Sequence, residues 1–547
     1  MGIIYNYKIM NVRFFIFLSS FLSINLFGQF ESAMQMGTQM SLGTLQGTAR
    51  FVGTGGVMGS VGGDISNLNT NPAGLAMFSR SEFEFTPTLS FNNANSNYLY
   101  TEGASKSSYN WENNRIKFTL NSVGVVIANR RSESSNLRSS NVTIGINRTA
   151  DFNRTVDFGV SNNTVYSYSN YLSGISTYFK NNISSFPAPG TFPTNADYFN
   201  LDNTYSRALM ARKSELVYYN STGNYYEDPT PYLQNNLNVS QFGQLKTTGG
   251  ITELSFAWSG NVKDRFYIGA SLGIPFLSYT SEFIFSEDNK GALASSPNSI
   301  YGNYLYMDLA EVDKFTGAGV NLKLGALYKV TDALKLSGYI HSPTYYEITN
   351  NYSIGITTKY QSNRNPGYEE LPEYKFNYFS PFKMGGGLSY MIGKHGFIGA
   401  EYEFNNLDNL TIDFDNEPQA KSYVNSVLRN QNQNVHLFKI GGELVVPNFD
   451  GDGGNSPFRI RVGYNYRTSP TNANYVEQKG DKIAQTYTAG LGYRGKTVSL
   501  DLAYMKTQFR DFNYLYGYDD GTRKFDFGVT SWNSINQFMA TVNFRFK

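Results

Sequence analysis

The sequence predicts an all-β protein, a transmembrane antiparallel β-barrel of about 14 strands whose lumen is plugged by an N-terminal hatch. Three observations lead to this fold class. From Ser81 onward, apolar and polar residues alternate with a period of two. The connections between the alternating segments are by turns very short and long. Beyond the N-terminal apolar run, no other apolar stretch is long enough for a membrane helix, so a membrane would have to be crossed by strands.

Composition excludes several classes of function. The chain has 547 residues, which is enough for one large barrel or for roughly two to four ordinary domains. Its formal net charge is only +2, so no bulk field points to nucleic acid as a partner. The absence of cysteine excludes thiolate metal sites, thiol catalysis, disulfides and a lipid anchor attached to cysteine. Tyr and Phe supply most of the 16% aromatic residues, a profile typical of many strands with aromatic punctuation.

Residues 1–28 have the features of a secretory signal peptide. Lys8 and Arg13 supply positive charge, the apolar run FFIFLSSFLSINLF follows, and Gly28 is a small residue at a plausible cleavage point. The alternative is a transmembrane anchor, but the run is shorter than the roughly 20 residues that a span needs. We therefore expect export, with a mature chain that begins near Gln29.

The alternation is clearest at the C-terminus, in the stretch FMATVNFRFK. Its apolar and aromatic side chains fall on one face of a strand and most of its polar side chains on the other. Alternation over about nine residues has the length of a tilted transmembrane strand. The aromatic ending at Phe546 is similar to the signal read by the barrel-insertion machinery of bacterial outer membranes. We expect that machinery to be a partner during biogenesis.

Alternation and turn signals together give roughly 14 strands. Their approximate spans are 82–92, 114–129, 140–155, 250–262, 264–286, 316–330, 332–349, 374–391, 396–413, 433–447, 456–469, 482–494, 496–513 and 534–546. The very short connections are at 263–264, 331–332, 393–395 and 495–496. The long connections are at 93–113, 156–249, 287–315, 350–373, 414–432, 470–481 and 514–533.

This alternation of connection lengths favours a membrane barrel. Outer-membrane barrels combine short periplasmic turns, long extracellular loops and an even number of strands. A soluble sandwich has no reason to place every long loop at one end. We therefore expect a bacterial outer-membrane location with the long connections outside the cell.

The charged residues of the strands share one face. Lys or Arg facing hydrocarbon costs about 2–4 kcal/mol at the membrane midplane, so this face must line the lumen. The basic lumen-facing candidates are Arg115, Lys117, Arg459 and Arg461. The other charged residues on this face are Glu253, Lys323, Lys335, Glu401, Glu403, Lys439, Glu443, Asp501 and Arg545. They either form a structural network across the barrel or, where basic, steer an anionic ligand.

The longest connection, about 156–249, contains two helical candidates. Apolar side chains from Tyr171 to Phe179 fall on one helical face, and the segment 206–219 could form a second helix. A self-packed loop and an apolar landing site for a hydrophobic ligand are equally compatible with this pattern.

No constellation of catalytic or metal-binding residues stands out. His341, His395 and His436 lie on different segments without metal-ligand spacing. The stretch DGDGGN at 450–455 suggests a calcium loop, but Arg461 stands where the bidentate glutamate would be, so a plain turn is favoured. We expect neither an enzyme nor a cofactor.

The glycine-rich segment from Gly47 to Arg80 precedes the first strand. It is too polar for a membrane span and too rich in glycine for an ordinary helix or strand. A barrel of about 14 strands encloses more space than its own side chains fill, and it would leak if left open. Small residues let a backbone approach the wall closely, and Pro72 fixes a bend. We expect residues 29–80 to form a hatch, followed by the barrel at 81–547.

The run GTARFVGTGGVMGSVGGDISNLNTNPAGLAMFSRSEFEFTPTLSF, residues 47–91, resembles the N-terminal hatch of the FadL-type outer-membrane transporters of long-chain fatty acids and other hydrophobic compounds. The triplet Asn71-Pro72-Ala73 followed by Gly74 is its most specific part. Residues 317–346 resemble a mid-barrel hairpin of that family, and residues 145–154 are similar to versions found in Bacteroidetes.

The resemblance implies a 14-stranded barrel in which a ligand binds an extracellular groove and then a lumenal pocket. Movement of the hatch and N-terminus then releases it, with exit sideways through the wall. The hatch residues that carry over are Asn71, Pro72, Ala73 and Gly74. Phe30 is matched to an aromatic residue that reaches into the ligand pocket.

Together these observations predict an outer-membrane channel for hydrophobic small molecules, with fatty acids as the first choice, operating by gated diffusion. Its expected partners are the hydrophobic ligand, outer-membrane lipid and the insertion machinery, with no nucleic acid. Two alternatives stay open: a binding or adhesion barrel acting through its long loops, and a general porin. The expected plug argues against the porin.

Overall fold

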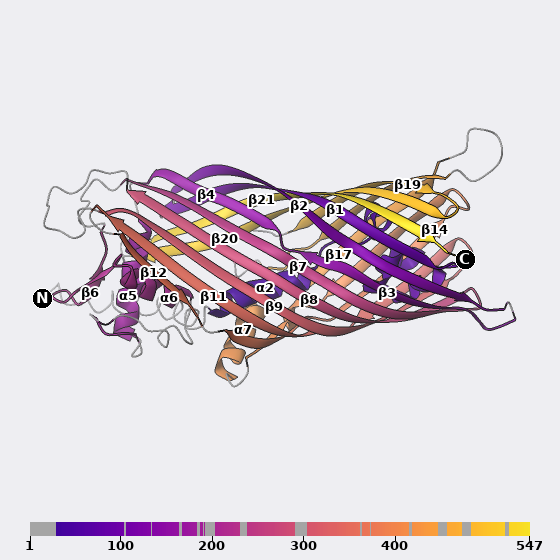
Figure 1. Cartoon of the computed structure of the whole chain (residues 1–547), viewed down its shortest axis with the longest axis horizontal. Coiled ribbons are helices and arrows are strands. Elements are labelled where there is room, and N and C mark those ends of the chain that lie inside the picture. The colour runs from indigo at the N-terminus through magenta and orange to yellow at the C-terminus, as the bar shows by residue number, and fades with distance from the viewer. Residues whose placement is uncertain are drawn as a thin grey trace, which may run out of the picture.

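In the computed structural model the chain forms a closed antiparallel β-barrel, with strands running obliquely around a long tube (Figure 1). The structure describes residues 29–546 except 103–104, 133, 164–166, 183–185, 190, 192–202, 230–237, 290–303, 362–363, 372, 415–417, 447–456, 473–482 and 520–523. The expected signal peptide and the turn at 450–455 lie outside these residues. No helix in the described part of the chain has the length and apolarity to cross a membrane.

The helical elements precede the barrel, lie in its loops, or cover its rim. They are α2 (Gln29–Leu42), α3 (Ala49–Gly53), α4 (Met58–Val61), η1 (Ile65–Asn69), η2 (Pro72–Met77), α5 (Tyr168–Asn182), α6 (Asn203–Lys213), η6 (Leu407–Asn409) and α7 (Pro418–Gln431). The strands are β1 (Glu82–Glu102), β2 (Ser105–Arg130), β3 (Leu137–Asp151), β4 (Arg154–Asn163), β5 (Tyr218–Asn220), β6 (Tyr225–Glu227), β7 (Val239–Val262), β8 (Phe266–Asn289), β9 (Tyr304–Lys329), β10 (Leu334–His341), β11 (Tyr345–Tyr360), β12 (Arg364–Glu370), β13 (Tyr374–Phe379), β14 (Lys383–Met391), β15 (Gly396–Asn405), β16 (Thr411–Asp413), β17 (Val435–Val445), β18 (Phe458–Arg467), β19 (Ala484–Arg494), β20 (Val498–Asp519) and β21 (Lys524–Arg545).

The sheet closes because β1 pairs with β2 on one side and with β21 on the other. Several positions in the wall are occupied by consecutive short strands: β3 with β4, β10 with β11, β12 to β14, and β15 with β16. Counted in this way, the barrel has 14 strands, which confirms the expected fold class.

Proline interrupts two of the strands that the sequence predicts to be continuous. Pro343 separates β10 from β11, and Pro381 separates β13 from β14. Proline has no N–H to donate to a ladder, so it ends regular pairing where it occurs. The segments 332–349 and 374–391 are therefore each two strands rather than one.

The alternation predicts the two faces of the wall correctly. On β20, Leu500 and Leu502 are 42% and 46% exposed, whereas Asp501 and Ala503 are 3% and 6% exposed. Outward apolar side chains recur in this way around the tube and form a continuous belt. Exposed apolar surface of this extent is stable only against hydrocarbon, so the belt is the membrane-spanning part of an outer-membrane barrel.

Outward polar residues mark one border of the belt on five adjacent strands. On β1, β2, β19, β20 and β21 these are Asn93, Asn114, Gln485, Lys506 and Asn536. The short hairpin connections, such as Lys263–Asp264, lie at the opposite end of the tube. Short turns are periplasmic in such barrels, so the end beyond this border, at the left in Figure 1, is extracellular.

The prediction of long loops at 93–113 and 514–533 is wrong, because most of these residues extend the neighbouring strands. β1 and β2 are paired out to Glu102 and Ser105, and β20 and β21 out to Asp519 and Lys524. Outside the membrane neither face of a strand meets lipid. The apolar alternation fades there while the hydrogen-bond ladder continues. The longest connection is also shorter than 156–249, since β4 and β7 take up both of its ends.

Candidate functional site: the plugged lumen

Residues from α3 to η2, here called the plug, fill the periplasmic half of the lumen (Figure 1). α3 contacts the wall at β18 to β21, α4 contacts β10, β14 and β15, and η2 contacts β7 to β9. The plug therefore touches the wall on all sides. Gly62 and Gly63 have φ angles of 78° and 70°, which side-chain-bearing residues rarely adopt, and they reverse the chain between α4 and η1.

The Asn71–Gly74 turn fastens the plug to β8 and β9. The Asn71 side chain accepts a hydrogen bond from the Ala73 backbone N–H at 3.1 Å. Its amide donates to the carbonyl oxygens of Gly59 at 2.9 Å and Ala326 at 3.2 Å, joining the turn to α4 and to the wall. Pro72 opens η2, where a missing N–H costs nothing. All four residues of the turn are buried.

Glycines in the wall form the seat of this turn. A Cβ at Gly325 would collide with Asn71 Oδ1, and one at Gly269 would collide with the backbone of Pro72. We expect Gly325→Ala to displace the turn, to cost about 1–3 kcal/mol of stability as overpacking does, and to raise the leak of small polar solutes. Unfolding in urea and a sucrose-leak assay measure these effects.

The control for this substitution is Gly338→Ala on β10. A Cβ at Gly338 has only the Gly385 carbonyl oxygen nearby, at 3.9 Å, so it fits without displacement. If the two variants leak and unfold alike, the turn is not seated on Gly325.

Ionic contacts hold the rest of the plug to the wall. Arg50 on α3 lies 3.5 Å from Glu443, and Arg461 bonds to both Glu443 and Asp501 at 2.7 Å. Arg461 is only 1% exposed. Burial disfavours the charge of the Arg50 guanidinium, but Glu443 and then Asp64 outweigh it and raise its pKa, so the ion pair persists.

The short helix α4 is held at both ends by wall charges. The Glu401 carboxylate accepts hydrogen bonds from the backbone N–H groups of Gly59 at 2.7 Å and Ser60 at 3.3 Å. The Lys335 ammonium donates to the Val61 carbonyl oxygen at 3.0 Å. Each charge has the sign that satisfies the unpaired backbone groups at its end of the helix.

Above the plug, α2 crosses the lumen against an apolar and aromatic lining. Met34, Met36 and Met40 are at most 7% exposed and belong to a cluster with side chains of β8, β9, β11 and β13. The Tyr378 hydroxyl donates to the Gly37 carbonyl oxygen at 3.0 Å. The methionines are unbranched and adaptable, a property that suits a surface accommodating varied apolar partners.

Two basic side chains, Lys383 and Arg467, lie beside this cluster. Neither Lys383 on β14 nor Arg467 on β18 has a hydrogen bond or ion pair with a described residue, and both are partly exposed. Lys383 Nζ lies 3.7 Å from where a Cβ would stand at Gly43, just beyond the end of α2. The neighbouring Lys439 differs, because it lies 3.7 Å from Glu403. The apolar lining is thus bordered by two cations that form no close ion pair with a described residue, although Glu403 attracts Lys383 from farther away.

Among the described strands, the backbone ladder of the wall is interrupted between β2 and β4. The ladder between β2 and β3 ends at the pair Ser122–Asn147, and above it β4 pairs with β7 alone among the described strands. Side chains of β2 cross this interruption instead of a ladder. Lys117 donates to Asn153 Oδ1 at 2.5 Å, and Arg115 donates to Thr155 Oγ1 at 3.2 Å.

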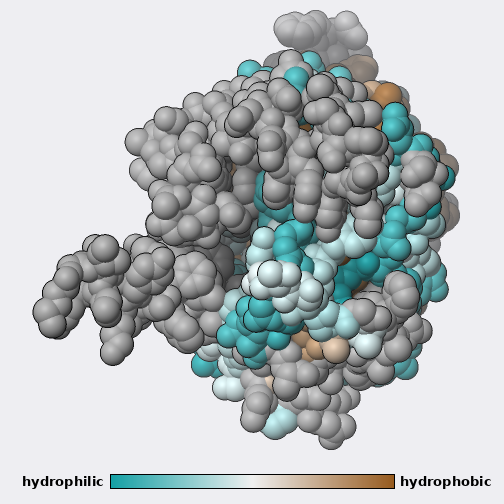
Figure 2. All heavy atoms as spheres, turned by 90° about the vertical axis from the view of Figure 1, so that its left-hand side faces the viewer, coloured by the Kyte–Doolittle hydropathy of each residue, from teal (hydrophilic) through white to brown (hydrophobic). Residues whose placement is uncertain are grey.

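A cap made of α5, α6 and the β5–β6 hairpin covers the extracellular mouth (Figure 1). The Glu287 carboxylate accepts from the Tyr168 N–H at 2.8 Å at the start of α5, and Arg207 forms two hydrogen bonds with Glu311. Beneath them the apolar faces of both helices pack into one aromatic-rich cluster. Figure 2 shows that the described side chains on this end of the molecule are mostly hydrophilic.

The structure brings only some of the expected site residues together. Arg115, Lys117 and Arg461 face inward, and they bond to other groups of the protein. Arg459 donates to the Phe458 carbonyl oxygen at 2.9 Å. Phe30 lies in the first turn of α2, and its side chain is outside the described residues. The helix expected from Tyr171 to Phe179 is confirmed as α5, whereas the expected 206–219 helix ends at Lys213.

Three parts of the site are not predicted from the sequence: α2, Lys383 and Arg467. The spacing of Met36 and Met40 fits one face of a helix and is the available signal for α2. Both residues lie within predicted strands, Lys383 in 374–391 and Arg467 in 456–469, but neither is among the charged residues predicted to line the lumen. No signal in the sequence marks them as lacking a partner.

No model of a protein family and no curated protein matches the chain. Solved structures do match. The structure of a Pseudomonas aeruginosa FadL homologue is 12% identical, with a TM-score of 0.50 over 92% of this chain and 99% of that one. The Pseudomonas putida toluene transporter TodX is 12% identical with a TM-score of 0.45 over 92% and 99%. The Ralstonia pickettii toluene transporter TbuX is 14% identical with a TM-score of 0.43 over 92% and 100%. The likeness to the FadL homologue confirms the resemblance at the level of fold.

Proposed function

We propose that this protein is an outer-membrane channel through which hydrophobic small molecules, most of all long-chain fatty acids, enter the cell by gated diffusion. The observation that carries the proposal is the pairing of the apolar α2 cluster with Lys383 and Arg467. A fatty acid has the same two parts, an apolar chain and one carboxylate. Charge-assisted bonds between Arg or Lys and a carboxylate are the strong ones in proteins.

The proposed route uses the parts of the lumen in order. A ligand enters at the cap, lies along α2 with its carboxylate toward Lys383 and Arg467, and waits above the plug. The Asn71–Gly74 turn sets the closed position of the plug, and Phe30 contributes an aromatic side chain to the pocket. Movement of the plug and α2 lets the ligand pass, either downward or sideways through the interrupted ladder between β2 and β4. The driving force is the concentration gradient alone.

The structural likeness supports the hydrophobic class of ligand, because two of the similar proteins are described as toluene transporters. Lys383 and Arg467 extend the proposed ligands from uncharged hydrophobic molecules to hydrophobic carboxylates. Assembly is proposed to rely on the alternating aromatic C-terminus, in which Phe544 and Phe546 are 41% and 49% exposed on the lipid face.

The double variant Lys383→Gln with Arg467→Gln tests the fatty-acid assignment. We expect its affinity for oleate to fall at least about tenfold, since hydrogen bonds to charged groups contribute about 1.5–3 kcal/mol. Affinity for oleyl alcohol, which has the same chain without the carboxylate, should stay within about twofold of wild type. Competition binding with radiolabelled ligand on detergent-purified protein gives both values.

The matched control is Lys375→Gln on β13, whose side chain is 59% exposed and points away from the lumen. If the double variant binds oleate as well as this control does, the carboxylate does not meet these cations. Equal losses of affinity for oleate and oleyl alcohol would mean that the pocket has been damaged. The assignment of Lys383 and Arg467 to the carboxylate would then be wrong.

A further inference from the structure

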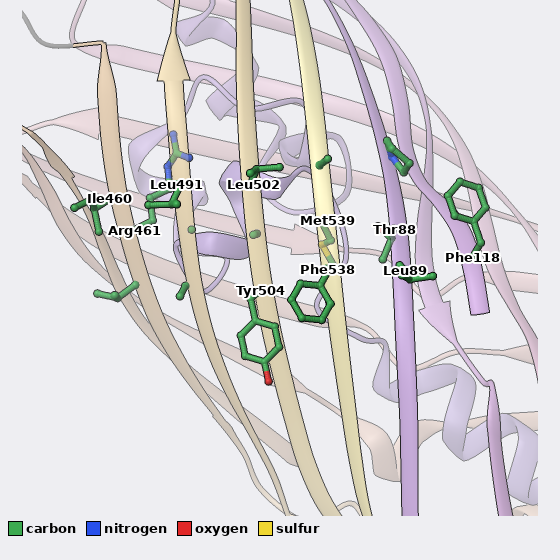
Figure 3. Close-up of a pocket in the computed structure, with 16 residues that line it drawn as sticks. Thr88, Leu89, Phe118, Ile460, Arg461, Leu491, Leu502, Tyr504, Phe538 and Met539 are labelled. Atoms are coloured by element: carbon green, nitrogen blue, oxygen red, sulfur yellow. The ribbon is translucent and has the colours of Figure 1, made fainter. Parts of the chain in front are cut away.

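A shallow groove runs across the outside of the wall over β18 to β21, β1 and β2, with a volume of about 580 Å³ (Figure 3). Its floor has small outward residues: Pro87 on β1, Ala540 on the neighbouring β21, and Ala489 on β19, which is separated from β21 by β20. Larger side chains rise around them: Leu89, Phe118, Ile460, Leu491, Tyr504 and Phe538. In Figure 3, Phe118 stands at one side of the groove, Ile460 at the other, and the Tyr504 and Phe538 rings lie side by side between them.

The groove lies within the membrane belt, just below its extracellular border. On β20 the next outward residue beyond Tyr504 is Lys506, and its neighbours across the ladder are Tyr487 and Asn536. Lys506 and Asn536 belong to the line of polar residues that bounds the belt, and Tyr487 lies beside it. The mouth of the groove is therefore at the level of lipid headgroups, and its body is at the level of their acyl chains.

Lys506 supplies positive charge at this border. Among the described residues it has no hydrogen bond or ion pair. A lysine stem can lie along the apolar wall while its ammonium reaches the headgroup layer. A cation held in this position attracts an anionic headgroup.

We propose that the groove and Lys506 form a binding site for one anionic, phosphate-bearing lipid of the outer leaflet. An acyl chain fills the hollow over Pro87, Ala489 and Ala540, and the ammonium of Lys506 meets the phosphate. The site lies on the outside of the wall, so it is independent of the transport function proposed above, and either can fail without the other.

The two parts of the site have different roles. The bilayer interior is as apolar as the groove, so an acyl chain gains close packing there and little from the hydrophobic effect. The groove therefore determines where the lipid lies, and the charge determines which lipid it is. One lysine near a membrane surface favours an anionic over a zwitterionic lipid by about fivefold.

Native mass spectrometry of the detergent-purified, full-length protein, titrated with dioleoylphosphatidylglycerol or dioleoylphosphatidylcholine, tests the proposal. We expect wild type to retain one phosphatidylglycerol about fivefold more tightly than phosphatidylcholine. The groove-filling variant Ala489→Phe with Ala540→Phe should lose this first bound lipid of either kind. Lys506→Gln should keep the lipid and lose the fivefold preference.

Each variant has a control on a distant part of the same belt. Ala400→Phe adds bulk to the outward face of β15, and Lys314→Gln removes an outward lysine from β9. Both should bind as wild type does, and all variants must show the shift between heated and unheated migration in SDS that marks a folded barrel. If the filled groove binds lipid like the Ala400→Phe control, the site is not there. The headgroup assignment is wrong if Lys506→Gln still prefers phosphatidylglycerol over phosphatidylcholine. It is also wrong if inorganic phosphate removes this preference from wild type without displacing the bound lipid.

Discussion

Deletion of residues 47–76 is expected to leave a folded barrel that conducts ions at least several-fold better than wild type and leaks sucrose. These residues form nearly all of the plug, and they contact the wall on every side of the periplasmic half of the lumen. The lipid-facing contacts and the closed ladder do not involve them. A barrel of this size is wider than its own side chains can fill, so removing the plug opens a water-filled bore.

The barrel should survive the deletion because the wall groups that the plug covers become hydrated. Glu401 and Lys335 lose their bonds to α4 but gain water. Arg461 keeps both of its carboxylate partners, which belong to the wall. The residues left between α2 and β1 number about nine and can span roughly 30 Å.

Planar-bilayer conductance and sucrose efflux, each normalised to heat-modifiable protein, measure the effect. A conductance equal to that of wild type would mean that the segment does not obstruct the tube. Loss of the heat-modifiable band would mean that the plug is needed for folding, which contradicts the independence of the two parts.

Arg461→Ala is expected to produce the largest loss of stability of any single substitution considered, about 3–5 kcal/mol, because it leaves buried carboxylates without their partner. The side chain of Arg461 has no exposed surface, and those of Glu443 and Asp501 are only 9% and 5% exposed. Arg50 still faces Glu443 from 3.5 Å, but Asp501 loses its ion-pair partner within the described residues.

Urea unfolding in detergent, followed by tryptophan fluorescence, measures this loss. Arg459→Ala is the matched control, since Arg459 is the same residue type two positions away on the same face and is more exposed. It should cost less than about 1 kcal/mol. Similar unfolding midpoints for the two variants would show that the Arg461 network contributes little to the stability of the barrel.

The fold could be predicted well because lipid imposes a strict rule on one face of each strand. Leu500 and Leu502 alternate with Asp501 and Ala503 in the sequence, and the structure exposes and buries them accordingly. Where lipid is absent the rule disappears. The extension of β1 from Asn93 to Glu102 reads as a polar loop although it is a paired strand. Between β2 and β4, side-chain bonds between residues far apart in the sequence replace the ladder, and no local pattern records them.

The candidate site could be predicted only in part. Small residues and the Asn71–Gly74 turn indicate a segment that packs closely against the wall, and the wall glycines at Gly269 and Gly325 agree with it. Alternation places Arg461 and Arg467 on the same inward face without distinguishing them. Arg461 forms ion pairs with Glu443 and Asp501, whereas Arg467 has no hydrogen bond or ion pair with a described residue. The difference depends on which strands become neighbours, and that is a property of the closed barrel.

The central claim is that this barrel admits hydrophobic carboxylates while excluding polar solutes. The most direct test is uptake of radiolabelled oleate by bacterial cells that lack their own outer-membrane fatty-acid channel and express this protein, with sucrose entry into the periplasm measured in parallel. The account predicts that oleate uptake rises well above that of cells with empty vector, while sucrose entry does not change. Unchanged oleate uptake with the folded protein in the outer membrane, or sucrose entry that rises together with it, would contradict the account.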